Sequence, residues 1–148
     1  MDRMLGNQKF LAGNFEEAIP LLENVLLKHP EDTHSVRKLI ICYLATGQLY
    51  RAIPSFINLL QKDTTLTSPT CDDTSSDLER EIFSSLTSSF KVGFNPAEQH
   101  LAAGILAMFF DCQLAQSFFK RAQKSDPNDE NTKKILDILH VKNHQLKH

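Results

Sequence analysis

A segment of this chain returns after 34 residues, and this spacing constrains the fold more than any other feature of the sequence. Positions that correspond in the two copies keep their residue type: Gly13 and Gly47, Ala18 and Ala52, Pro20 and Pro54, and the bulky apolar pair Leu22 and Phe56. A period of about 34 residues with helical apolar spacing is typical of a solenoid built from pairs of antiparallel helices. The sequence therefore predicts an all-α helical-repeat fold, with two helix hairpins in residues 1–63.

The residue types at the repeated positions agree with this geometry. Gly13 and Gly47 stand where a first helix must stop and reverse, which calls for a left-handed backbone that glycine adopts without strain. Asn14 is expected to cap the second helix. Ala18 and Ala52 are expected where the two helices approach most closely. The second helices carry an apolar stripe at i, i+3 and i+4 spacing, formed by Leu22, Val25 and Leu26 and by Phe56, Leu59 and Leu60.

These residues resemble the tetratricopeptide repeat family. The first repeat is matched by Leu5, Gly6, Gly13, Ala18, Leu22, Val25 and Pro30, and the second by Leu39, Tyr43, Gly47, Ala52, Phe56 and Leu59. The resemblance covers residues 2–63 and resumes at Ala115, Phe119, Ala122 and Pro127. It implies a right-handed solenoid of paired helices whose concave groove binds protein partners, whereas the particular partner is not given by the fold.

Periodicity and capping signals predict about eight helices in one domain that spans residues 1–148. The expected helices are 2–12, 15–28, 34–46, 49–62, 77–91, 96–109, 112–124 and 129–143. Residues 63–76 are rich in Ser, Thr and Asp and are expected to form a loop. Along the chain, the two hairpins of 1–63 precede a loop plus an irregular helix (64–94), a degenerate third repeat (95–127) and a capping helix (128–148).

The middle of the chain departs from the repeat pattern. Phe110 stands where the third repeat should carry its turn glycine, and the helix at 77–91 has no repeat-mate. Asn95 followed by Pro96 predicts a capped start for the next helix. The small residues Ala102, Ala103, Gly104 and Ala107 predict that this helix is the most buried of the chain. The solenoid is therefore expected to be irregular between residues 63 and 111.

Composition narrows the classes of function. A net charge of −2 speaks against a nucleic-acid or membrane-surface role on charge alone. The longest uncharged apolar run, 101–110, is about half of what spans a bilayer, and the N-terminus lacks the apolar core of a secretion signal. The three cysteines have no metal or redox spacing, which favours free thiols in a reducing compartment. We therefore expect a cytoplasmic protein with no cofactor, no metal, no nucleic-acid partner and no membrane insertion.

In the family that the chain resembles, the first helix of each repeat lines the groove. The positions that correspond here are Arg3, Asn7, Phe10 and Leu11 from the first repeat and His34, Arg37, Lys38, Ile41 and Leu44 from the second. Arg3 and Asn7 resemble half of the clamp with which chaperone-binding members hold a carboxylate, since Arg offers a bidentate fork. Ala97 and Leu101, however, stand where the third repeat should supply basic residues. This favours a generic peptide- or helix-binding groove through Phe10, Ile41 and Leu44, rimmed by Arg37 and Lys38.

Three further sets of residues have a functional and a structural interpretation. His140, His144 and His148 share a helix face and could chelate a metal, although a solvated tail is favoured. Cys112 beside Asp111, with His100 a helix away, could form a nucleophile–base pair, although a packed cysteine in a turn is favoured. Ser75 and Ser76 could be phosphorylated, and Ser76 with Glu79 also reads as a capping box.

The sequence thus favours a non-catalytic protein–protein interaction module, such as an adaptor, a co-chaperone-like factor or an assembly subunit. Two alternatives remain open: a secretion-type chaperone for an exported client, and a regulatory N-terminal domain of a larger enzyme. Outward charges at Lys133, Lys134 and Asp137 favour a complete chain over a fragment. A homodimer through helix 96–109 or the Phe-rich helix 112–124 is also possible from the pattern.

Overall fold

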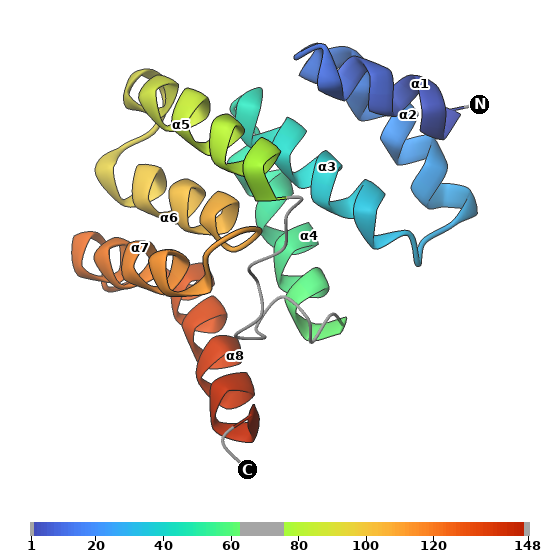
Figure 1. Ribbon diagram of the computed structural model, residues 1–148. Coiled ribbons are helices and arrows are strands. Elements are labelled where there is room, and N and C mark those ends of the chain that lie inside the picture. Colours follow the sequence, from blue (N-terminus) through green and yellow to red (C-terminus); the bar gives the residue numbers. More distant parts are fainter. Residues whose placement is uncertain (1, 63–75, 147–148) are drawn as a thin grey trace. The chain divides into compact units, whose positions relative to one another are not determined.

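The computed structural model describes residues 2–62 and 76–146, and these residues form eight α-helices and no strand (Figure 1). The helices are α1 (Asp2–Leu11), α2 (Phe15–Lys28), α3 (Thr33–Ala45), α4 (Leu49–Lys62), α5 (Ser76–Gly93), α6 (Pro96–Ala107), α7 (Cys112–Ser125) and α8 (Glu130–Leu146). The all-α prediction is confirmed, and every helix begins and ends within about three residues of its predicted bounds. Residues 63–75, where the loop was predicted, lie outside the described residues.

The helices fall into two compact units, Met1–Leu59 and Leu60–His148. The first unit contains α1, α2, α3 and most of α4, and the second contains the remaining helices. Each unit is described by itself below. The single domain over residues 1–148 and its subdivisions stay a prediction.

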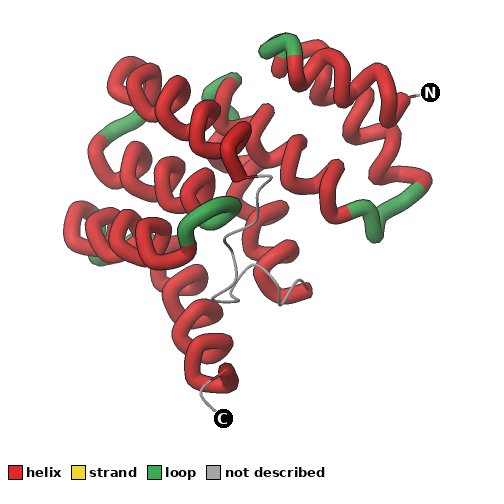
Figure 2. Tube along the Cα trace, viewed as in Figure 1, coloured by secondary structure: helices red, strands yellow, loops and turns green. Residues whose placement is uncertain are grey.

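In the first unit, glycine turns close the helix hairpins, as Figure 2 shows by the short loops between helices. Gly13 has φ +82° and Gly47 has φ +79°, so both adopt the left-handed backbone that was predicted. The amide of Asn14 donates to the carbonyl of Lys9 at 2.9 Å, and the amide of Gln48 donates to the carbonyl of Tyr43 at 2.7 Å. These bonds satisfy carbonyls that the helix ends would otherwise leave unpaired.

The helices of the first unit pack through the small and large residues that the repeat pattern singled out. Ala18, Leu22, Ala52 and Phe56 are fully buried. A Cβ on Gly6 would lie 3.2 Å from Cδ2 of Leu22, so α1 approaches α2 closely at this glycine. The repeat signal therefore identified the core of this unit.

The side-chain cap predicted at Asn14 is wrong, whereas α3 does have a side-chain cap. Asn14 precedes α2, but its side chain makes no capping hydrogen bond; its φ of −84° and ψ of 68° lie outside the extended region usual for a cap. Its carbonyl instead accepts from the amide of Ala18 at 3.0 Å. Asp32 does cap α3, because its carboxylate accepts from the amide of Ser35.

In the second unit, α5, α6 and α7 lie side by side (Figure 1), and α7 also contacts α8. Asn95 caps α6 in a reciprocal capping box with Glu98, and Pro96 occupies the first turn, as predicted. Every residue from Leu101 to Phe110 is buried, which agrees with the expectation for this helix. A Cβ on Gly104 would lie 2.6 Å from Cε1 of Phe119, so α6 approaches α7 closely at this glycine.

Aromatic side chains fill the space between α5, α6 and α7. Phe83 of α5 contacts Phe110 and Phe118, with ring centroids 5.4 Å and 5.8 Å apart, and His100 stacks on Phe118 at 6.3 Å. The Arg80 guanidinium lies 5.0 Å from the centroid of the Phe110 ring. Phe110 is thus a packing residue, although it occupies the position of a turn glycine.

The last helix behaves as the sequence suggested within the part that is described. Ile135 and Leu139 are buried, whereas Lys133, Lys134 and Asp137 are exposed. The side chains of the predicted Ser76–Glu79 capping box lie outside the described residues.

Candidate binding surface

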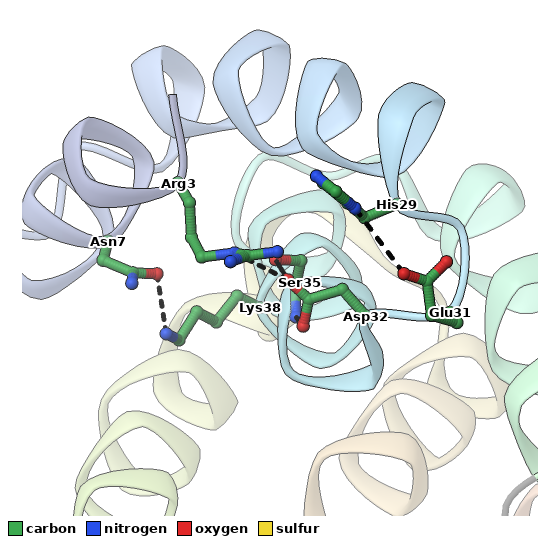
Figure 3. Close-up of polar contacts among 7 residues, drawn as sticks. All are labelled: Arg3, Asn7, His29, Glu31, Asp32, Ser35 and Lys38. Carbon is green, nitrogen blue, oxygen red and sulfur yellow. Dashed lines mark hydrogen bonds and ion pairs between the residues drawn. The ribbon is translucent and has the colours of Figure 1, made fainter. Parts of the chain in front are cut away.

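The first helices of the two hairpins, α1 and α3, lie side by side in the first unit. Two polar contacts join them, as Figure 3 shows. Nε of Arg3 donates to Oδ2 of Asp32 at 2.9 Å. Nζ of Lys38 donates to Oδ1 of Asn7 at 2.7 Å. The structure therefore brings together Arg3, Asn7 and Lys38, which the sequence had placed in one groove.

Asp32 ties this group to the start of α3. Its Oδ2 accepts a hydrogen bond from Oγ of Ser35 at 2.8 Å, and its Oδ1 accepts from the amide of Ser35 at 3.4 Å. Burial raises the pKa of the Asp32 carboxyl, but the Ser35 hydrogen bonds and the Arg3 charge outweigh it, so that the pKa lies below its ordinary value of 3.8. Asp32 therefore stays ionised at neutral pH and holds Arg3 against α3.

The predicted groove residues differ in their access to solvent. The Arg3 side chain is 55% exposed, His34 is exposed, and Asn7, Arg37 and Lys38 are half-buried. Phe10, Ile41 and Leu44 are instead buried, with exposed fractions of 4%, 3% and 1%. The accessible part of the surface is thus polar and cationic, and its predicted apolar floor lies in the core.

The burial of these apolar residues has local causes. The ring of Phe10 packs edge-on against Phe15, with centroids 5.7 Å apart, where α1 turns into α2. Ile41 and Leu44 belong to an unbroken buried run of α3, residues 39–44. Leu11 is 67% exposed, but helical geometry places it on a face of α1 with Met4 rather than with Arg3.

Asp32 and Ser35 are site residues that the sequence reasoning did not include. Asp32 follows Arg3 by 29 residues, which is shorter than the repeat period, so the repeat spacing alone does not point to this pair. The cap that opens α3 nevertheless meets a side chain from the start of α1.

The other candidate residues have structural contacts. The carboxylate of Asp111 accepts from the amide of Leu114 at 3.1 Å and caps α7, and the ring of His100 lies against Phe118. Burial raises the pKa of the Cys42 thiol to about 12, which disfavours the reactive thiolate. Cys112 is half-buried.

No three His, Cys, Asp or Glu side chains lie close enough to hold a metal ion within the described parts of the chain. His140 is exposed. The side chains of His144 and His148, and Cys71 and Ser75, lie outside the described residues. None of the described helices is both long and apolar enough to cross a membrane.

Comparison with known proteins bears on residues 9–64, which match the model of a tetratricopeptide repeat family. No match was found among curated proteins or solved structures. Because the match ends at residue 64, the degenerate third repeat at 95–127 stays a prediction. Tetratricopeptide repeats generally mediate protein–protein interactions and are typically non-catalytic. Over residues 9–64, the chain is thus similar to the tetratricopeptide repeat family.

Proposed function

We propose that the chain is an adaptor that binds an acidic segment of a protein partner on the α1–α3 face, defined as Arg3, Asn7, Asp32, His34, Arg37 and Lys38. The observation that carries this proposal is the joining of α1 and α3 by the Arg3–Asp32 and Asn7–Lys38 contacts. These contacts gather polar side chains from two successive repeats on one surface. Repeat proteins of this kind use such surfaces to engage an extended or helical segment.

Charge favours an acidic segment. The α1–α3 face carries three cationic side chains and one carboxylate, whereas the whole chain has a net charge of −2. The Asp32 contact uses Nε of Arg3. The two Nη nitrogens, which this contact does not use, can receive a carboxylate of the partner in a bidentate geometry.

The side chains of the α1–α3 face are held in place before a partner binds, which favours affinity for that partner. Asp32 holds Arg3 from one side, and the Asn7–Lys38 hydrogen bond fixes the neighbouring pair. Side chains that are already ordered lose less conformational entropy when a partner binds. The α1–α3 face therefore needs little rearrangement in order to bind.

The experiment compares capture of partners from the native lysate by three chains. One is wild type, one is Arg37→Glu/Lys38→Glu, and one is the charge-matched control Lys120→Glu/Lys124→Glu, whose two lysines are exposed on α7. Ile41 is left unchanged because it is buried, and a charge there would unfold the chain. Circular dichroism confirms that each chain is folded.

A protein that binds wild type and the control but not the α1–α3 variant supports the proposal. The segment that binds should be acidic, and its affinity should fall with added salt because exposed charges are screened. Equal binding to all three chains would overturn the assignment to this face. A bound segment that is neutral or basic would overturn its acidic specificity.

A further inference from the structure

We propose that the segment bound by the α1–α3 face is an amphipathic helix, whose acidic side contacts that face and whose apolar side covers Met4 and Leu11. The inference rests on the proposed function, to which it adds an apolar contact. Met4 and Leu11 are 68% and 67% exposed. They belong to the five large hydrophobic residues that are exposed in the described part of the chain. They therefore offer apolar area to a partner.

Helical geometry places Met4 and Leu11 beside the α1–α3 face. They are seven residues apart, so they point to the same side of α1 and lie about 10 Å apart along its axis. Asn7 lies three residues after Met4 and four before Leu11, so its side chain is a neighbour of both. Oδ1 of Asn7 also accepts from Nζ of Lys38 at 2.7 Å (Figure 3). Met4 and Leu11, which we call the apolar edge, therefore border the α1–α3 face.

The surroundings of the apolar edge differ from those of another exposed leucine, Leu27 of α2, which is 82% exposed. Leu27 stands alone, because Glu23 precedes it by one turn and the exposed Lys28 follows it. Single exposed apolar residues of this kind are ordinary, whereas adjoining ones with a polar rim are typical of a contact surface. The apolar edge has such a rim on the side of Asn7. It is therefore better suited than Leu27 to bind a partner.

A helical segment fits the apolar edge better than an extended one. An extended segment must find partners for its own N–H and C=O groups, and burying these groups unpaired is costly. The surface of α1 offers few partners, because the backbone groups of a helix bond within it. A helix satisfies its own backbone groups and repeats its apolar residues at i, i+3 or i+4, and i+7. This period matches the seven-residue spacing of Met4 and Leu11.

The position of the apolar edge also fixes where the partner helix carries its acidic residues. Arg3 is 55% exposed and lies on one side of the edge, and its contact with Asp32 uses only Nε. A carboxylate of the partner can form charge-assisted hydrogen bonds with the Nη nitrogens. Gln8, on the other side of the edge, is uncharged. The acidic residues are therefore expected along one flank of the partner's apolar stripe.

The experiment measures binding of two synthetic peptides by fluorescence anisotropy. Both are composed of Glu, Ala and Leu. In the patterned peptide the leucines recur with the helical period and the glutamates follow one flank of the leucine stripe, whereas the scrambled peptide has the same composition without a stripe. Wild type should bind the patterned peptide with a dissociation constant in the micromolar range. The scrambled peptide should bind about tenfold more weakly or worse.

Three single substitutions locate the apolar contact on the chain. Leu11→Ser should raise the dissociation constant of the patterned peptide by about tenfold, because a leucine side chain no longer contributes to the buried area. Met4→Ser should have a similar effect. Leu27→Ser is the matched control, since it removes an exposed leucine near the end of another helix and should leave the dissociation constant unchanged. Circular dichroism verifies the fold of each variant.

The charge variant Arg37→Glu/Lys38→Glu separates this inference from the proposed function. If it weakens binding while both peptides bind equally well, or while Leu11→Ser and Met4→Ser have no effect, the apolar contact is overturned and the acidic contact stands. If it has no effect while Leu11→Ser weakens binding, the apolar contact stands and the acidic contact is overturned.

Two further results would contradict the inference. A patterned peptide that does not bind wild type at millimolar concentration would overturn the helical partner, whereas the capture experiment would still decide the proposed function. A loss with Leu27→Ser as large as the loss with Leu11→Ser would show that the apolar contact is not specific to α1.

Discussion

The α1–α2 hairpin of the first unit and the α6–α7 hairpin of the second unit reverse the chain by different means. The first turns at Gly13, with φ +82°, and a Cβ there would meet nothing within 4 Å. The second turns through residues 108–111, which have no positive φ, and the side chains of Phe109 and Phe110 are buried. A helix hairpin can thus reverse through an open glycine turn or through a turn that belongs to the core.

The turn of the second hairpin is made by short-range hydrogen bonds. The amides of Phe109 and Phe110 donate to the carbonyls of Leu106 and Ala107, at 3.2 Å and 3.0 Å. This tighter winding ends α6 at Ala107, two residues before the end that the sequence predicted. It also turns the Phe110 ring toward Phe83. The missing glycine is therefore compensated by packing.

The residues that meet where the two helices approach closely are separated by one residue fewer in the second hairpin than in the first. Gly6 meets Leu22, which lies 16 residues later, whereas Gly104 meets Phe119, which lies 15 residues later. The contact at Gly104 is the tighter of the two, with 2.6 Å against 3.2 Å for an added Cβ. The larger ring of Phe119 and the smaller separation leave no room for a methyl group.

Among the variants that test the difference between the two hairpins, Phe110→Gly is expected to cause the greatest loss of stability. This change supplies the glycine of the repeat pattern, yet it should lower the free energy of unfolding by about 3–5 kcal/mol, as for deletion of a buried aromatic ring. Urea unfolding followed by circular dichroism measures the loss. Phe110→Leu, which keeps most of the apolar volume, should cost clearly less. Unchanged stability of Phe110→Gly would mean that the turn itself decides the hairpin.

The next effect is expected at the two close approaches. Gly104→Ala should destabilise the chain by about 1–3 kcal/mol, because the added methyl meets a fully buried ring that has no space to move. Gly6→Ala should be close to neutral, since a small shift of Leu22 is offset by a gain in helix propensity of about 1 kcal/mol. Thermal unfolding of the pair decides this, and equal losses would contradict the difference in packing.

Most of the helical architecture could be predicted from the sequence because it depends on local patterns. The left-handed turns at Gly13 and Gly47 and the cap at Asn95 each need only neighbouring residues. Exposure along α3 could not be predicted in the same way. Its residues 39–44 form a continuous apolar run, so that periodicity does not say which of them face a neighbouring helix.

The contacts of the candidate surface could likewise be predicted only in part from the sequence. Arg3, Asn7 and Lys38 were placed together by the repeat register, which sets how successive first helices lie against each other. The contact of Arg3 with Asp32 was not foreseen, because it depends on the rotamer of a long side chain and on the exact start of α3. Fold thus follows from the periodic residues, whereas the polar contacts depend on tertiary detail.

Substitutions at the glycine turns of the first unit are expected to cause a smaller loss of stability. Gly13→Ala and Gly47→Ala should each cost about 1–2 kcal/mol, because the left-handed backbone strains a residue with a Cβ. Gly93→Ala is the control, since Gly93 ends α5 without a positive φ and with open space around an added Cβ. Urea midpoints of the three variants measure the effect. Equal behaviour of Gly93→Ala and Gly13→Ala would contradict the role given to φ.

The smallest loss of stability is expected from a change in the side chain that caps a helix. The caps of α3 and α6 differ in charge. Asp32 caps α3 and also binds Arg3, whereas Asn95 caps α6 through a neutral side chain that accepts from the amide of Glu98 at 2.8 Å. Asp32→Asn keeps one capping oxygen, but it removes the ion pair with Arg3 and the second oxygen, which accepts from Oγ of Ser35. At neutral pH it should cost about 0.2–1 kcal/mol, as for other partly exposed ion pairs.

The pH dependence of this loss follows from the direction of the pKa shift. The pKa of Asp32 is lowered in the folded chain: burial raises it, but the Ser35 hydrogen bonds and Arg3 together lower it further. Its contribution to stability is therefore complete above the unfolded pKa and is lost as pH falls through the folded pKa. Urea midpoints of wild type and Asp32→Asn should differ at pH 7 and converge below pH 3.8.

Arg3→Gln should reproduce part of the difference, and in the double variant the two losses should not add, because both remove the same contact. A constant difference across this range would instead assign the effect of Asp32→Asn to the cap.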